Sequence, residues 1–218
     1  MGQWPADAGL LRFSGFRVAS QMAGGGRCPV KLSVRRCGVE VRGRGAGWLC
    51  WGSMSYVLTL GLDDDSQAHF ERLRRMYFPP ERNLIPAHLT LFHLLPEVEP
   101  VRERVAAEAG EWSRFAVRVT GVRALGRGVA YRMEAEELSL LHARLSAGFA
   151  DVLSPQDRQR FQPHIVVQNK VKPEAARLLL GRLESEFVPM EPRAVGLDLW
   201  EYMGGPWRME RRYAFRAE

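Results

Sequence analysis

Two histidines occupy matching places in two short segments that lie 76 residues apart. His88 lies in PAHLTL (residues 86–91) and His164 in PHIVV (residues 163–167). Each follows a proline closely and opens an apolar run typical of a buried strand. Two imidazoles on opposite sides of a phosphodiester can act as general base and general acid, because a pKa of about 6.5 suits proton transfer at neutral pH. Such a pair can therefore act on a phosphodiester without a metal or a cofactor.

Strand geometry predicts which side chains accompany the histidines. Residues i and i+2 of a strand project from the same face, so Thr90 is expected beside His88 and Val166 beside His164. The Thr90 hydroxyl can donate a hydrogen bond to a phosphate oxygen and stabilise the charge that develops there. A single histidine at the start of a strand is more often structural, and it is the matched pair that favours catalysis.

Three further sets of side chains are assigned structural roles. His93 follows His88 by five residues, so alternation places it on the opposite face of the strand. His69 and His142 fall in predicted helices and have no catalytic partner near them in the sequence. Trp200, Tyr202 and Trp207 could stack on a base, but alternating large residues in a closing strand are more typical of core packing.

The elements that must position these residues follow one order twice. The order is helix, strand, helix, strand, strand, and an additional strand opens the first copy. The first copy comprises a strand over 56–61, a helix from about 63 to 78, a strand over 88–95, a helix over 98–109 and strands over 115–124 and 129–134. The second comprises a helix over 136–153, a strand over 164–168, a helix over 173–187 and strands over 195–203 and 207–216.

This repeated order predicts an α+β protein with two similar lobes, in which largely antiparallel sheets are flanked by helices. If a pseudo-twofold axis relates the lobes, His88 and His164 face each other across a cleft between them. The cleft is the expected active site.

Charge is distributed unevenly along the chain. The net charge is +6, and residues 1–53 alone hold eight basic and two acidic residues, so the remainder is neutral. The basic character of the whole chain is therefore no argument for RNA binding by residues 54–218. The first 53 residues also contain 11 of the 21 glycines, and we expect a disordered Arg/Gly-rich extension there, or upstream sequence preceding a natural start at Met54.

Composition excludes several classes of protein. No apolar run approaches the ~20 residues that span a bilayer, and 46% hydrophobic with 26% charged residues is ordinary for a soluble domain. Three cysteines, spaced nine and thirteen apart, match neither a disulfide framework nor a zinc site. We expect a cytoplasmic protein, monomeric, without a metal, cofactor or membrane partner.

The sequence from about residue 56 to residue 215 resembles the two-histidine phosphoesterases, which include bacterial 2′-5′ RNA ligases and 2′,3′-cyclic phosphodiesterases. PAHLTLFHLLP carries the first motif, FQPHIVVQNKV the second, and LWEYMGGPW is similar to the closing strand and turn. The resemblance implies a bilobal fold with the site between the lobes. It also implies metal-independent acid–base catalysis by His88 and His164 on cyclic or 2′,5′-linked phosphodiesters of RNA or nucleotides.

One residue departs from the family pattern. The pattern has Thr or Ser two residues after each histidine, whereas the second copy has Val166. Loss of one such donor lowers rates by about 10²–10³-fold in other enzymes. Either Gln168, two residues further along the same strand face, or Lys170 supplies the missing phosphate contact beside Thr90 of the first copy, or the enzyme is slow.

Two other functions stay open at this point. The cleft could be a non-catalytic RNA- or nucleotide-binding module that has lost the second hydroxyl. Alternatively, the Arg/Gly-rich N-terminus could carry RNA affinity, as disordered basic segments do. Deleting residues 1–53 tests the second alternative, since unchanged RNA affinity would exclude it.

Overall fold

The computed structural model describes residues 10–13, 16–19, 31–35, 38–42 and 55–217. Chain contacts divide the protein into two units, residues 1–53 and 54–218. In the first unit, β1 (Leu10–Phe13) pairs with β2 (Phe16–Ala19), and β3 (Lys31–Arg35) pairs with β4 (Gly38–Arg42). The expected disordered extension falls largely outside the described residues and stays a prediction.

The second unit is built on one antiparallel sheet with the strand order β12-β11-β5-β6-β10-β9-β8, and β7 pairs with β11. Its strands are β5 (Ser55–Leu62), β6 (Leu89–Pro96), β7 (Phe115–Ala116), β8 (Arg118–Ala124), β9 (Val129–Glu134), β10 (His164–Gln168), β11 (Arg193–Tyr202) and β12 (Trp207–Ala214). The central strands β6 and β10 come from the two sequence copies.

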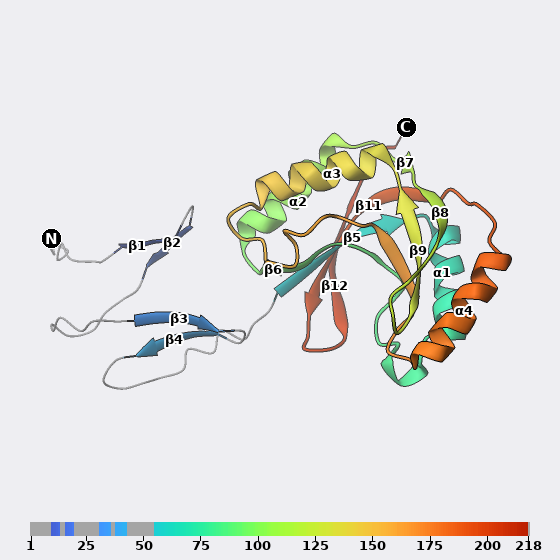
Figure 1. Cartoon of the computed structure of the whole chain (residues 1–218). Coiled ribbons are helices and arrows are strands. Elements are labelled where there is room, and N and C mark those ends of the chain that lie inside the picture. Colours follow the sequence, from blue (N-terminus) through green and yellow to red (C-terminus); the bar gives the residue numbers. More distant parts are fainter. Residues whose placement is uncertain (1–9, 14–15, 20–30, 36–37, 43–54, 218) are drawn as a thin grey trace, which may run out of the picture. The chain divides into compact units, whose positions relative to one another are not determined.

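Four α-helices and a short 3₁₀ helix accompany the sheet in residues 55–217, and Figure 1 shows their arrangement. They are α1 (Asp64–Tyr77), η1 (Pro80–Arg82), α2 (Glu99–Glu111), α3 (Glu136–Gly148) and α4 (Pro173–Ser185). Helix α1 contacts β10 and α4 contacts β8 and β9, whereas α2 contacts β11, β12 and α3. Each half of the sheet therefore packs against its own helix pair.

Local sequence signals explain where α1 begins and ends. The Asp63 side chain accepts a hydrogen bond from the backbone N–H of Ser66 at 2.9 Å, which satisfies one of the unpaired donors at the helix start. Asp64 and Asp65 place negative charge in the first turn, where the helix dipole favours it. The helix ends at Tyr77 because Pro79 soon follows.

The predicted helix over 136–153 is wrong in its C-terminal part, because α3 ends at Gly148. Glycine is a poor helix former, and a Cβ here would lie 2.5 Å from Arg104 Nε of α2. A larger residue at this position would therefore displace the Arg104 side chain, which packs between α2 and α3. Phe149 is buried beyond the helix and packs against Phe92 at 5.5 Å between ring centroids.

The core lies on both faces of the sheet, and β9 illustrates how alternation builds it. Val129, Tyr131 and Met133 are buried, and the Tyr131 ring packs 5.7 Å from Phe70 of α1. Arg132 and Glu134 project from the opposite face and are exposed.

The predicted α+β class with antiparallel strands is confirmed, whereas the pseudo-twofold relation of two lobes stays a prediction. Within the described ranges, no helix is both long and apolar enough to cross a membrane.

Candidate functional site

The site is built where β6 and β10 join. Leu89 and Ile165 are direct partners across this antiparallel pair, so His88 lies opposite Val166 and Thr90 lies opposite His164. All four flanking side chains share one face of the sheet and are half-buried. The two histidines form a diagonal pair, for which the separation is about 7–8 Å. That spacing leaves room for a phosphate group between the imidazoles.

A pocket of about 440 Å³ opens over these four residues. The other side chains around it come from β6, β8, α3, the segment before β10 and the start of β12. They are Leu91, His93, Arg123, His142, Gln156, Asp157, Gln159, Arg160, Phe161, Gln162 and Trp207. The pocket is therefore rich in imidazole, guanidinium and amide groups, which suit an anionic ligand.

The two histidines make the same backbone hydrogen bond. Nδ1–H of His88 donates to the carbonyl oxygen of Pro86 at 2.7 Å, and Nδ1–H of His164 donates to that of Gln162 at 2.7 Å. A carbonyl oxygen only accepts, so each Nδ1 carries the proton and each Nε2 keeps its lone pair. Both imidazoles are thereby held in the tautomer that presents Nε2 for proton transfer.

Burial and nearby positive charge favour the neutral form of both histidines. Burial lowers the pKa of His88 to about 4, and the positive charge of Arg74 adds to this effect, while the Pro86 hydrogen bond opposes it. Burial likewise lowers the pKa of His164, and Arg123 acts in the same direction. Both shifts favour the neutral imidazole at pH 7.

Trp207 fixes the orientation of the His88 ring. The two ring centroids lie 4.6 Å apart, and Trp207 in turn lies 6.2 Å from Trp200. Trp200 Nε1–H donates to Thr59 Oγ1 at 2.9 Å, and Thr59 is the β5 partner of Thr90. Trp200 and Trp207 therefore support the site and Trp207 also lines it, whereas Tyr202 is exposed rather than packed in the core.

The structure does not bring Gln168 or Lys170 to this pocket. The register of β10 shifts after Val166, so that Val166 pairs with Ala130 and Gln168 with Val129. This bulge reverses the alternation and buries Gln168 on the face of Val129. Lys170 is exposed beyond the strand end, at a φ of 60°. Substrate binding by these two residues stays a prediction that their placement does not favour.

The expectation that His93 faces away from His88 is wrong, because His93 lines the same pocket. The pairing of β5 with β6 shifts between Thr90 and Phe92, so one residue of β6 is inserted and the alternation reverses. His93 Nδ1 lies 3.1 Å from Asp157 Oδ1, and the backbone N–H of His93 donates to the same oxygen at 2.7 Å. Asp157 thereby ties the segment before β10 to β6.

The hydrogen bonds of Asp157 and a stack of three rings around His142 hold the segment before β10 over the pocket. Burial would raise the pKa of Asp157, but hydrogen bonds from His93 and Ser154 outweigh burial and lower it. The His142 ring is stacked between Phe92 at 4.8 Å and Phe161 at 3.8 Å. His142 is therefore a buried packing residue, as expected, although it also borders the pocket.

Arg123 and Arg160 are pocket residues that the sequence did not single out. Arg123 Nη1–H donates to Gln162 Oε1 at 2.7 Å, which anchors the guanidinium beside His164. Its only signal in the sequence is a polar position near the hairpin turn over 125–128.

Within the described residues, no group of three or more His, Cys, Asp or Glu side chains is arranged to hold a metal ion.

Comparison with known proteins identifies relatives of this fold. A family profile described as "2′-5′ RNA ligase superfamily" matches residues 62–206. The protein TT0787 of Thermus thermophilus has a similar crystal structure, with a TM-score of 0.53 and 20% identity over 76% of this chain and 100% of that chain. E. coli LigT complexed with 3′-AMP gives a TM-score of 0.49 and 17% identity over 74% of this chain and 98% of that chain. No curated protein matches the sequence.

Proposed function

The chain belongs to the 2′-5′ RNA ligase superfamily, and from this premise we propose that it is a phosphoesterase that hydrolyses 2′,3′-cyclic or 2′,5′-linked phosphodiesters of RNA or nucleotides. The observation that carries the proposal is the matched pair His88 and His164. Both line one pocket, both make the same Nδ1 hydrogen bond, and both keep Nε2 available. We further propose that the protein acts as a monomer in the cytoplasm.

In this mechanism His88 is the general base and His164 the general acid. His88 has its pKa lowered to about 4, so its Nε2 is free at neutral pH to take a proton from water. The water oxygen bonds to phosphorus, and the bond from phosphorus to the leaving ribose oxygen breaks. Binding of the anionic substrate raises the pKa of His164, so its Nε2 takes up a proton from solvent and donates that proton to the leaving oxygen, while His88 later returns its proton to solvent.

Two other side chains stabilise the charge on the phosphate. The Thr90 hydroxyl is opposite His164 and donates a hydrogen bond to a non-bridging oxygen. The guanidinium of Arg123, which lines the pocket beside Val166 and His164, binds the same oxygens. Arg123 thereby takes the role that the sequence alone assigned to Gln168 or Lys170.

The experiment that tests this function measures hydrolysis of the four 2′,3′-cyclic nucleotides and of a 2′,5′-linked dinucleotide in EDTA. A 3′,5′-linked dinucleotide serves as the control substrate. We expect turnover of a cyclic or 2′,5′-linked substrate to a single 2′- or 3′-phosphate product, because protonation of one defined oxygen fixes the regiochemistry. A folded protein that turns over none of these substrates would contradict the proposal.

A second function, a non-catalytic module that binds RNA or nucleotides in the same pocket, is favoured by one observation. Val166 lies opposite His88, at the position where a hydroxyl would otherwise contact the phosphate. A binding module would hold phosphate through Thr90 and Arg123 without turnover.

A further inference from the structure

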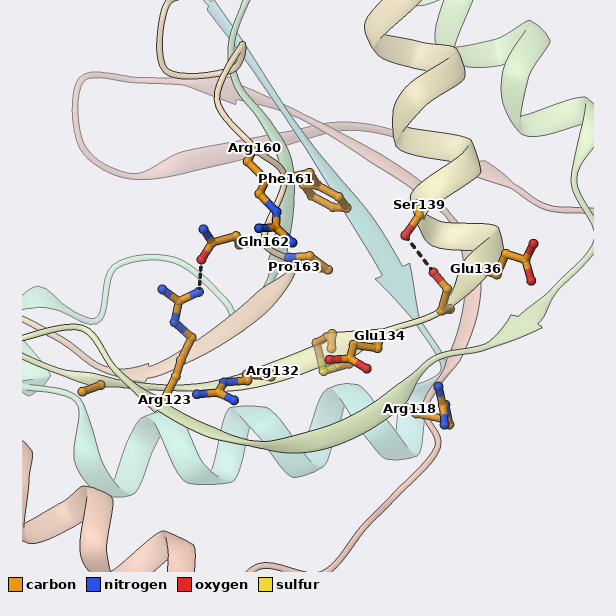
Figure 2. Close-up of a pocket in the computed structure, with 13 residues that line it drawn as sticks. Arg118, Arg123, Arg132, Glu134, Glu136, Ser139, Arg160, Phe161, Gln162 and Pro163 are labelled. Atoms are coloured by element: carbon orange, nitrogen blue, oxygen red, sulfur yellow. Dashed lines mark hydrogen bonds between the residues drawn. The ribbon is translucent and has the colours of Figure 1, made fainter.

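A second, larger groove lies beside the histidine pocket. Its volume is about 930 Å³, and it is formed by β8, β9, the start of α3 and the segment before β10 (Figure 2). Four arginines line it, namely Arg118, Arg123, Arg132 and Arg160. The site described above gives Arg123 a role and includes Arg160 in its lining, but Arg118 and Arg132 lie outside it.

The groove continues directly from the histidine pocket. Arg123, Arg160, Phe161 and Gln162 line both. Arg132 is the direct β9 partner of His164, which places their Cβ atoms about 4.5–5.5 Å apart on the same face of the sheet. A chain that places one phosphate at His164 therefore meets Arg132 next.

The groove then extends along β9 to Arg118. Arg118 pairs with Glu134, which lies two residues beyond Arg132 on the same face. Two residues of a strand span about 7 Å, so Arg118 lies about that much further along the sheet from His164 than Arg132 does. The line from His164 through Arg132 to Arg118 is a path for successive anionic groups.

The groove arginines are available to an anion. Arg118, Arg132 and Arg160 are exposed, and in the described part of the chain none of the three forms an ion pair with a carboxylate. Glu134 and Glu136 also line the groove, so four positive and two negative side chains face it. The excess positive charge and the volume of about 930 Å³ fit a phosphate backbone better than a single small anion.

We propose that this groove, the Arg118–Arg132 groove, binds the phosphates of an RNA strand whose reacting end lies in the histidine pocket. The preferred substrate is then an oligoribonucleotide rather than a free mononucleotide. This inference rests on the proposed function, since that function places the reacting phosphate between His88 and His164. Arg132 contacts the phosphate next to the reacting one, and Arg118 contacts the phosphate after it.

Binding is tested without turnover, using fluorescence anisotropy of a labelled RNA hexanucleotide that ends in a 3′-phosphate. The double variant Arg118→Gln/Arg132→Gln is expected to raise Kd at least 10-fold. It should also reduce the slope of log Kd against log salt by about 1.4, at about 0.7 per phosphate contact on a single strand. Arg118→Lys/Arg132→Lys keeps both charges and should restore most of the affinity, which separates charge loss from misfolding.

The matched control is Arg177→Gln/Arg182→Gln, which removes two exposed arginines of α4 that line neither pocket. This variant loses the same net charge and is expected to bind RNA like the wild type. Equal Kd values and salt slopes for the two glutamine double variants would overturn the proposal, because the RNA would then respond to net charge alone.

Turnover separates failure of this inference from failure of the proposed function. We expect kcat/KM for a hexanucleotide ending in a 2′,3′-cyclic phosphate to exceed that for 2′,3′-cyclic CMP by at least 10-fold, and the ratio to fall towards one in Arg118→Gln/Arg132→Gln. A wild-type ratio of one would overturn the inference and leave the phosphoesterase function standing. Arginine-dependent RNA binding with no turnover of either substrate would support the groove and overturn the phosphoesterase function.

Discussion

Replacing either His88 or His164 with alanine is expected to lower kcat/KM for a 2′,3′-cyclic nucleotide by about 10²–10⁴-fold, the usual contribution of a positioned acid or base. Each variant loses one of the two proton transfers, because the remaining histidine cannot reach both the water and the leaving oxygen. The loss is expected mainly in kcat, since Thr90 and Arg123 still hold the phosphate. Steady-state kinetics in EDTA measure the effect.

His69→Ala is the matched control for these substitutions. His69 is a half-buried histidine of α1 that lines neither pocket, and its replacement should therefore leave kcat/KM within about two-fold of wild type. Circular dichroism of all three variants checks that they are folded. If His88→Ala or His164→Ala retained wild-type kcat, that histidine would have no part in the chemical step.

The hydroxyl positions give the second large effect. Thr90→Val should lower kcat by about 10²–10³-fold, as loss of one preorganised donor does elsewhere. Conversely, Val166→Thr should raise kcat, by as much as about 10²-fold, because it adds a donor opposite His88. Val166 is half-buried at the pocket, so the new hydroxyl can contact the ligand rather than remain buried without a partner.

Val166→Thr also distinguishes an enzyme from a binding module. A weakened enzyme gains turnover in Val166→Thr. A binding module has no turnover as wild type or as Val166→Thr, and only its Kd for nucleotides changes. Val166→Ala is the control, because it removes volume without adding a donor. Equal rates for Val166→Thr, Val166→Ala and wild type would mean that no hydroxyl is needed at this position.

The order and type of the elements could be predicted from the sequence because hydrophobic period and proline positions are local signals. The strand over 129–134, for example, alternates apolar Val129, Tyr131 and Met133 with Arg132 and Glu134, and it has the predicted bounds. The end of α3 was missed because the apolar spacing of Leu141 and Leu145 continues to Phe149, which is buried in the core although it lies beyond the helix end.

Alternation failed where a bulge interrupts a strand. The insertion near Leu91 turns His93 towards the pocket, and the bulge after Val166 turns Gln168 away from it. No local pattern marks either bulge in this sequence. The grouping of Arg123 with His164 depends on the strand order β6-β10-β9-β8, which single-sequence periodicity does not contain.

The most direct test of the paired histidines is the pH dependence of kcat/KM for a 2′,3′-cyclic nucleotide, measured for wild type, His88→Ala and His164→Ala. Activity falls at low pH when the base is protonated and at high pH when the acid is deprotonated. Because the pKa of His88 is lowered to about 4 and that of His164 lies below 6.5, we expect a bell-shaped profile with its maximum on the acid side of neutrality. His88→Ala should lose the acidic limb and His164→Ala the basic limb. A profile that keeps both limbs in both variants would contradict acid–base catalysis by this pair.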